Sequence, residues 1–192
     1  MIANNLRRGL LEHVAETGFM AYHGSPKEIN KFVDDFVGAN EATDQEGPGI
    51  YFTTEFDDAA GYGKYVYSVR LRGKYLVSTG DPNGINKTLV MKLAKMAEDW
   101  KMEAQNYHEN PNRGIIELVN GAYEYNEDEK GVLQQIWINL YRYRPVEFVR
   151  NCVKLGIDGI IVDRYANAEN GGKHIIIYNP NTIEYLEMEV TE

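Results

Sequence analysis

Segments with the period of β-strands occur near both ends of this chain, and a long block with the period of α-helices separates them. Residues 64–71 alternate in polarity, as expected of a half-buried strand. The strand-like segments are residues 19–22, 49–54, 64–71, 158–163, 174–178 and 184–189. The helical patterns between them are residues 86–106, 115–123, 127–143 and 145–155. This order predicts one α+β domain over residues 1–192, with a helical insertion at about residues 86–143.

Capping signals refine this outline. Apolar residues recur at helical spacing over residues 6–15, so we expect an N-terminal helix. Ser25 stands before a proline and has the pattern of a helix start, which predicts a helix over residues 26–34. Thr54 is expected to cap a short helix over residues 55–60.

The charge balance disfavours a role in coating nucleic acid or anionic membranes. The formal net charge is −9, so nonspecific adhesion to polyanions is repulsive. Basic residues gather in one late segment, which we interpret as a solvated helical face: Arg142, Arg144, Arg150, Lys154 and Arg164. No membrane partner is expected.

Cysteine and acidic residues give no sign of a metal site. The chain has one cysteine, Cys152, which excludes a disulfide framework within it and a cysteine-based metal centre. Its apolar surroundings predict a buried, inert thiol. The acidic run 124–129 is predicted to be a solvated loop. The first residues lack the apolar core of a signal peptide, and no apolar run is long enough to span a bilayer, so we expect a soluble, cytoplasmic protein.

Several short motifs follow one another in a characteristic order. A strand ends at His23-Gly24-Ser25, and a second strand begins with Gly49-Ile50-Tyr51-Phe52. Tyr62 follows, with ten residues between the two tyrosines. The last motif is a pair of terminal strands preceded by a polar loop.

In these motifs the chain resembles the ADP-ribosyltransferase superfamily, in its branch with a His-Tyr-acid signature. That branch includes diphtheria-toxin-like enzymes, poly(ADP-ribose) polymerases and small phage-borne transferases, some of which disable bacterial CRISPR complexes. The resemblance covers both ends of the chain, roughly half of it, and residues 79–145 have no counterpart. It implies an α+β split β-sandwich with NAD⁺ bound between two packed sheets, an N-terminal helix and the helical insertion outside the cleft.

The resemblance also implies roles for the motif residues. Tyr51 and Tyr62 would clamp the flat nicotinamide cation by stacking and cation–π attraction, each contact contributing about 0.5–2 kcal/mol. His23 would hydrogen-bond a ribose hydroxyl, and Gly24 would let backbone groups approach the carboxamide. The complete set expected to bind NAD⁺, with no metal, is His23, Gly24, Ser25, Gly49, Tyr51, Phe52 and Tyr62.

The catalytic acid is where this sequence departs from the family. Relatives place a glutamate at the start of a late strand to support the oxocarbenium-like transition state. His174 occupies that position here, and a histidine does not supply the same fixed negative charge. Glu169, in the preceding loop, is the residue we expect to act as the acid, with Asp163 as the reserve.

These implications predict a mono-ADP-ribosyltransferase that releases nicotinamide from NAD⁺ and modifies a host macromolecule. A host protein is favoured over nucleic acid as acceptor, and the setting would be a phage or bacterial effector. Residues 38–48, a Gly- and Asn-containing segment predicted to be a mobile loop, and the helical insertion are expected to recognise the acceptor.

Three alternatives remain open at this stage. A non-catalytic NAD⁺-binding module is favoured by His174, and an NAD⁺ glycohydrolase would use water as acceptor. RNA 2′-phosphotransferases share the fold but rely on Arg and His for a phosphate, and no Arg-rich counterpart stands beside His23.

Overall fold

The computed structural model describes residues 18–33, 47–78, 80–97, 111–163 and 172–191. The predicted N-terminal helix, most of the predicted loop over residues 38–48, Arg164 and Glu169 lie outside these ranges. Strands and helices are both present, so the predicted α+β class is confirmed.

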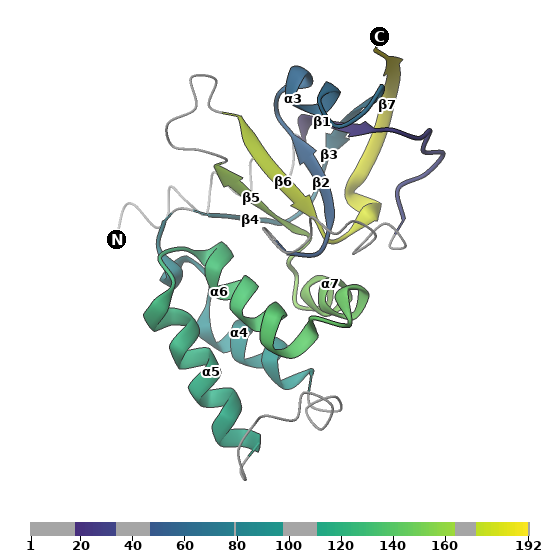
Figure 1. Ribbon diagram of the computed structural model, residues 1–192. Helices are drawn as coiled ribbons and strands as arrows, with labels where there is room; N and C mark the ends of the chain where they lie inside the picture. Colours follow the sequence, from purple (N-terminus) through teal and green to yellow (C-terminus); the bar gives the residue numbers. More distant parts are fainter. Residues whose placement is uncertain (1–17, 34–46, 79, 98–110, 164–171, 192) are drawn as a thin grey trace.

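Seven described strands form one sheet in the order β4-β5-β6-β2-β1-β3-β7 (Figure 1). All neighbours are antiparallel except β4 and β5, which are parallel. The strands are β1 (Phe19–Ser25), β2 (Ile50–Thr53), β3 (Tyr65–Leu71), β4 (Tyr75–Val77), β5 (Gly159–Asp163), β6 (Lys173–Ile177) and β7 (Ile183–Val190).

The two strands at the centre of the sheet, β1 and β2, share the fewest paired residues. β1 and β2 are joined through one residue pair, Tyr22 with Thr53, whereas β1 and β3 are paired from Phe19 to Ser25. The resemblance to ADP-ribosyltransferases implies two packed sheets. In the structure these are two halves of one hydrogen-bonded sheet, β4-β5-β6-β2 and β1-β3-β7, that meet at this single pair.

Two of the strands differ from their sequence patterns. β3 was expected to be half-buried, but Val66, Tyr67, Ser68 and Val69 are all buried, because both faces of this strand are covered. β4 was not predicted, since three residues are too short to show a period. β4 gains its partner from β5, about eighty residues later in the chain, through Tyr75 with Gly159.

The helices between the two groups of strands agree in position with the sequence patterns, except that the helix predicted over residues 86–106 ends at Lys95, and residues 98–106 lie outside the described ranges. Asn86 caps α4, its side chain accepting from the Thr88 amide at 2.8 Å, and Asp128 caps α6 through the Gly131 amide at 2.7 Å. Gly156, with φ of +83°, follows the last helix, as predicted. The helical segments are α3 (Phe56–Ala60), α4 (Lys87–Lys95), α5 (Pro111–Tyr125), α6 (Glu129–Ile136), a π-helical segment Trp137–Tyr141, α7 (Pro145–Lys154), and 3₁₀ turns Pro82–Gly84 and Pro180–Thr182.

The helix predicted over residues 26–34 is wrong for its described part, because residues 26–33 are not helical. The Ser25 hydroxyl accepts from the Lys27 amide, but the segment is then tied to β3 by a hydrogen bond from the Ile29 amide to the Tyr67 hydroxyl. Phe32 is buried against the rings of the sheet. These contacts with the sheet replace the hydrogen bonds of a local helix.

The predicted cap of α3 is also wrong. Glu55, not Thr54, is the N-cap, and it has no side-chain capping bond. The Thr54 hydroxyl instead accepts a hydrogen bond from the Lys173 amide at 3.0 Å. Thr54 therefore ties the end of β2 to the beginning of β6.

The predicted solvated loop over residues 124–129 is wrong at both of its ends. Glu124 belongs to α5, and Glu129 begins α6 and is 1% exposed. The predicted solvated basic face is confirmed for Arg142, Arg150 and Lys154, which are exposed, whereas Arg144 is half-buried.

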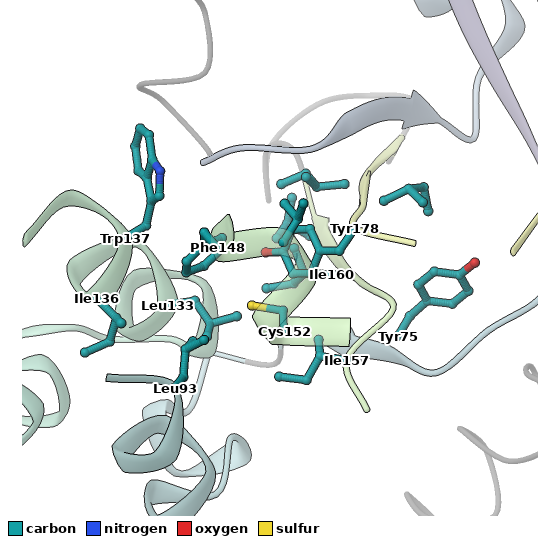
Figure 2. Close-up of a cluster of buried hydrophobic side chains, with 14 of the residues drawn as sticks. Tyr75, Leu93, Leu133, Ile136, Trp137, Phe148, Cys152, Ile157, Ile160 and Tyr178 are labelled. Atoms are coloured by element: carbon teal, nitrogen blue, oxygen red, sulfur yellow. The ribbon is translucent and has the colours of Figure 1, made fainter. Parts of the chain in front are cut away.

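One hydrophobic cluster links the sheet with the helices (Figure 2). Helices α4–α7 lie together on one side of the sheet (Figure 1). The short helix α3 lies beside β1, away from this group of helices. Phe148 of α7 packs edge-on against Tyr178, with ring centroids 5.9 Å apart, and Cys152 is completely buried beside them. The predicted burial of Cys152 is confirmed, and this burial raises the pKa of its thiol well above the ordinary value. No helix among the described residues is long and apolar enough to cross a membrane.

Candidate functional site

His23 connects the first two motifs directly. Its Nδ1 lies 2.7 Å from the backbone carbonyl oxygen of Tyr51. A carbonyl oxygen only accepts, so Nδ1 carries the hydrogen, and Nε2 of the neutral ring is left as an acceptor. Burial lowers the pKa of His23, and the hydrogen bond to Tyr51 opposes this only in part. The imidazole is therefore neutral near pH 7.

Aromatic rings hold the His23 side chain in place. Its ring centroid lies 5.2 Å from that of Phe32, which is nearly perpendicular, and 5.3 Å from that of Phe52. Tyr67, its partner on β3, is 6.2 Å away. Phe52, expected among the NAD⁺-binding residues, thus packs against His23 and is 2% exposed.

The strand register places other motif residues on a common face. Tyr22 of β1 pairs with Thr53 of β2, and Thr53 pairs with His174 of β6. Paired residues share a face of a sheet, and so do residues two apart on one strand. Tyr51 and Gly24 therefore lie on the same face as His174, whereas His23 lies on the other.

Helix α3 covers the Gly24 side of this face. Phe56 meets Tyr22 edge-on, with ring centroids 5.6 Å apart. A Cβ added at Gly24 would lie 1.7 Å from the carbonyl oxygen of Ala59. The resemblance implies that the missing side chain of Gly24 lets backbone groups approach a ligand, but the packing of α3 already requires glycine at this position.

The turn after α3 places Tyr62 beside the end of β1. The Tyr62 amide donates to the Ala59 carbonyl at 3.0 Å. A Cβ at Gly24 would lie 3.1 Å from Cβ of Tyr62, and one at Gly63 would lie 2.1 Å from the carbonyl carbon of Ser25. The Tyr62 side chain is 56% exposed, and Ser25 is buried.

Tyr51 is held more tightly than Tyr62. Its hydroxyl donates to the carbonyl oxygen of Gly47, and its ring is half-buried against the core. Gly49 is needed just before it, because a Cβ there would lie 2.4 Å from Cγ2 of Ile176. Tyr51 on β2 is thus anchored, whereas Tyr62, in the turn beside Gly24, is exposed.

The beginning of β6 lies against α3. The Thr54 amide donates to the Lys173 carbonyl at 3.1 Å, alongside the bond from Lys173 to the Thr54 hydroxyl. A Cβ at Gly172 would lie 3.0 Å from Cγ of Glu55 and 3.4 Å from Oδ2 of Asp58. His174 is half-buried two residues further along.

Of the two acids predicted from the sequence, only Asp163 lies within the described residues. Glu169 lies outside the described residues, so its predicted role stays a prediction. Asp163 ends β5, where its backbone pairs with Lys173. Asp58 was not singled out from the sequence, although its place in the short segment between Tyr51 and Tyr62 could have drawn attention to it. Among the described residues no group of three or more His, Cys, Asp or Glu could hold a metal ion.

Comparison with known proteins leaves the family open. No protein-family model and no curated protein matches the chain. One solved structure, described as an anti-CRISPR protein, is 14% identical with a TM-score of 0.44, covering 90% of this chain and 98% of its own. That level of likeness identifies neither a family nor a function.

Proposed function

We propose that this protein is a mono-ADP-ribosyltransferase that uses NAD⁺ as substrate and releases nicotinamide. The observation that carries the proposal is the hydrogen bond of His23 to the Tyr51 backbone, which links the two motifs of the sequence resemblance. The position of Tyr62 beside Gly24, on the sheet face that Gly24 shares with Tyr51, adds to it. Each motif residue would then act on a different part of the dinucleotide.

In this proposal NAD⁺ extends across the point where the two halves of the sheet separate, with its nicotinamide on the face of Tyr51 and its adenosine ribose on the face of His23. Tyr62 and Tyr51 take the nicotinamide ring, and Nε2 of His23 accepts a hydrogen bond from a hydroxyl of the adenosine ribose. The neutral, fixed imidazole suits this task, because positioning a hydroxyl needs an acceptor and no proton transfer. Backbone groups of Gly24 and Ser25 would hold the carboxamide.

The proposed reaction is a dissociative glycosyl transfer. The bond between C1′ of the ribose and the nicotinamide nitrogen breaks, and its electron pair leaves with the neutral nicotinamide. A lone pair of the acceptor then forms the new bond to C1′, and the acceptor's proton passes to solvent. A carboxylate near the ribose would stabilise the positive charge that develops between these events.

We propose a host protein as the acceptor and a bacterial cytoplasm as the place of action, as for a phage or bacterial effector. The net charge of −9 disfavours nucleic acid. If water took the acceptor's place, the same site would hydrolyse NAD⁺.

A non-catalytic NAD⁺-binding module is the second candidate, because His174 stands at the position where the relatives carry glutamate. The two candidates differ in turnover. A transferase releases nicotinamide and labels a macromolecule, whereas a binding module retains intact NAD⁺.

The test is nicotinamide release from NAD⁺ labelled in its adenine half, with and without bacterial lysate. Wild type is expected to release nicotinamide and to transfer label to a protein. Tyr62→Ala is expected to reduce release about 2- to 30-fold, the equivalent of about 0.5–2 kcal/mol of lost ring contact. Tyr143→Ala is the matched control, because Tyr143 is 91% exposed and lies outside the proposed site.

Each outcome decides between the candidates. Equal release by Tyr62→Ala and Tyr143→Ala would remove Tyr62 from the site. Binding of NAD⁺ by wild type without any nicotinamide release would overturn the transferase and favour the binding module.

A further inference from the structure

The proposed site lacks a carboxylate at the beginning of β6. His174 lies there, paired with Thr53 on the face that Tyr51 shares. An imidazole is neutral or positive, so it does not supply the negative charge that an oxocarbenium-like state requires. If transfer occurs, the charge comes from another element that reaches this face.

Helix α3 is such an element. Phe56 and Ala59, three residues apart, face β1, where they meet Tyr22 and Gly24. The carboxylate of Asp58 extends instead toward β6, since its Oδ2 lies 3.4 Å from the Cβ position of Gly172. The helix thus spans the distance between the Gly24 motif and the beginning of β6.

Helix α3 ends at Ala60, and the exposed Tyr62 lies in the turn that follows it, where its amide donates to the Ala59 carbonyl at 3.0 Å. Ala59 is the neighbour of Asp58 in sequence. A nicotinamide ring on Tyr62 whose ribose is directed toward β6 would bring C1′ toward the Asp58 carboxylate.

Two other carboxylates, Asp57 on α3 and Glu55 at its N-cap, are weaker candidates. Asp57 is exposed. Of its two neighbours in sequence, Phe56 faces β1 and Asp58 extends toward β6. Glu55 precedes the helix as its N-cap, and its Cγ lies 3.0 Å from the Cβ position of Gly172. Its Oε1 accepts from the Thr54 hydroxyl at 3.3 Å, which places its carboxylate at the end of β2. Asp58 is half-buried, so its carboxylate is partly shielded from water.

We propose that Asp58 is the catalytic carboxylate of this site, accepting a hydrogen bond from a hydroxyl of the nicotinamide ribose and stabilising the positive charge at C1′ as nicotinamide leaves. The inference rests on the proposed transferase function. In this step the electron pair of the broken bond leaves with nicotinamide, and the acceptor supplies the pair for the new bond.

The test compares nicotinamide release by four variants of the full chain. Asp58→Asn is expected to lower kcat on the order of 100-fold or more, the scale of losing one charge-stabilising group, with KM for NAD⁺ little changed. Asp58→Glu is expected to retain part of the activity. Asp57→Asn is the matched control on the same helix and is expected to behave as wild type, as is Glu55→Gln.

A relocation experiment separates catalysis from a structural role. His174→Glu in the Asp58→Asn background returns a carboxylate to this face from β6, and it is expected to restore release at least tenfold. If Asp58 only made a structural contact, a carboxylate placed on β6 by His174→Glu would not restore activity. Far-UV circular dichroism and the melting temperature of each variant check that it folds.

The outcomes distinguish this inference from the proposed function. Turnover by wild type with Asp58→Asn equal to Asp57→Asn would overturn the role of Asp58 and leave the transferase standing, with Glu169 as the acid to test next by Glu169→Gln. Absence of turnover by wild type, despite NAD⁺ binding, would overturn both.

Discussion

At the scale of single residues, His23 combines a fixed tautomer with a lowered pKa, and this makes stability depend on pH. Burial disfavours the charged imidazole in the fold, whereas the unfolded chain protonates His23 at its ordinary pKa of 6.5. The stabilising effect of the neutral ring is complete above that pH. As pH falls below it, the unfolded chain takes up the proton first, so the free energy of unfolding decreases.

This effect can be isolated by comparing wild type with His23→Asn, which keeps a side-chain donor for the Tyr51 carbonyl. Urea denaturation at pH 7.5, 6.5 and 5.5 is expected to show that the stability difference between the two proteins shrinks as the pH falls. A constant difference across this range would mean that His23 titrates alike in the folded and unfolded chains.

At the residue scale, the order of the motifs along the chain carried part of the information about which residues lie close together. The motif order brought His23, Tyr51 and Tyr62 into one region, and the structure joins the first two by a hydrogen bond. It did not single out Asp58, because the contact of α3 with Gly172 depends on β6, more than one hundred residues later. The motif also suggested that Gly24 is glycine because a ligand approaches it, whereas in the structure the carbonyl of Ala59 leaves no room for a side chain there.

At the scale of elements, the close contact of α3 with β1 predicts that Gly24→Ala is destabilising. The added Cβ would lie 1.7 Å from a backbone carbonyl oxygen, which has no rotamer by which to move away. Overpacking of this kind costs about 1–3 kcal/mol, and α3 would shift together with Tyr62. Thermal denaturation measures the loss.

Gly121→Ala is the matched control for this substitution. Gly121 lies within α5, and a Cβ there would meet Tyr125 at an ordinary distance of 3.7 Å. Alanine is a better helix former than glycine by roughly 1 kcal/mol, so this variant is expected to melt higher than wild type. Equal melting temperatures for the two variants would argue against the tight docking of α3.

Long elements with a clear period were predictable from the sequence, and short ones were not. α4 and α7 carry amphipathic patterns and recognisable end signals, Asn86 and Gly156. Residues 26–33 carry a helix-start signal, yet a hydrogen bond and a buried ring on β3 override it. Tertiary contacts decide such segments, because a single helical turn contributes little stability alone.

At the scale of the whole molecule, the buried cluster joins the helices to the sheet, and Cys152 lies at their junction. Because one core stabilises both layers, we expect them to unfold together in a single transition. The buried thiol reports on that junction, since it is completely inaccessible in the fold and its pKa is raised by burial. Cysteine reagents need an exposed thiolate, so labelling of Cys152 requires the layers to separate.

The experiment follows thiol labelling and far-UV circular dichroism through the same urea titration. The chain has one cysteine, so all specific label reports on Cys152, and Cys152→Ala supplies the background. Coincident midpoints are expected. Labelling at urea concentrations well below the circular dichroism midpoint would instead mean that α7 leaves the sheet before the helices and strands melt, and that the two layers are separate folding units.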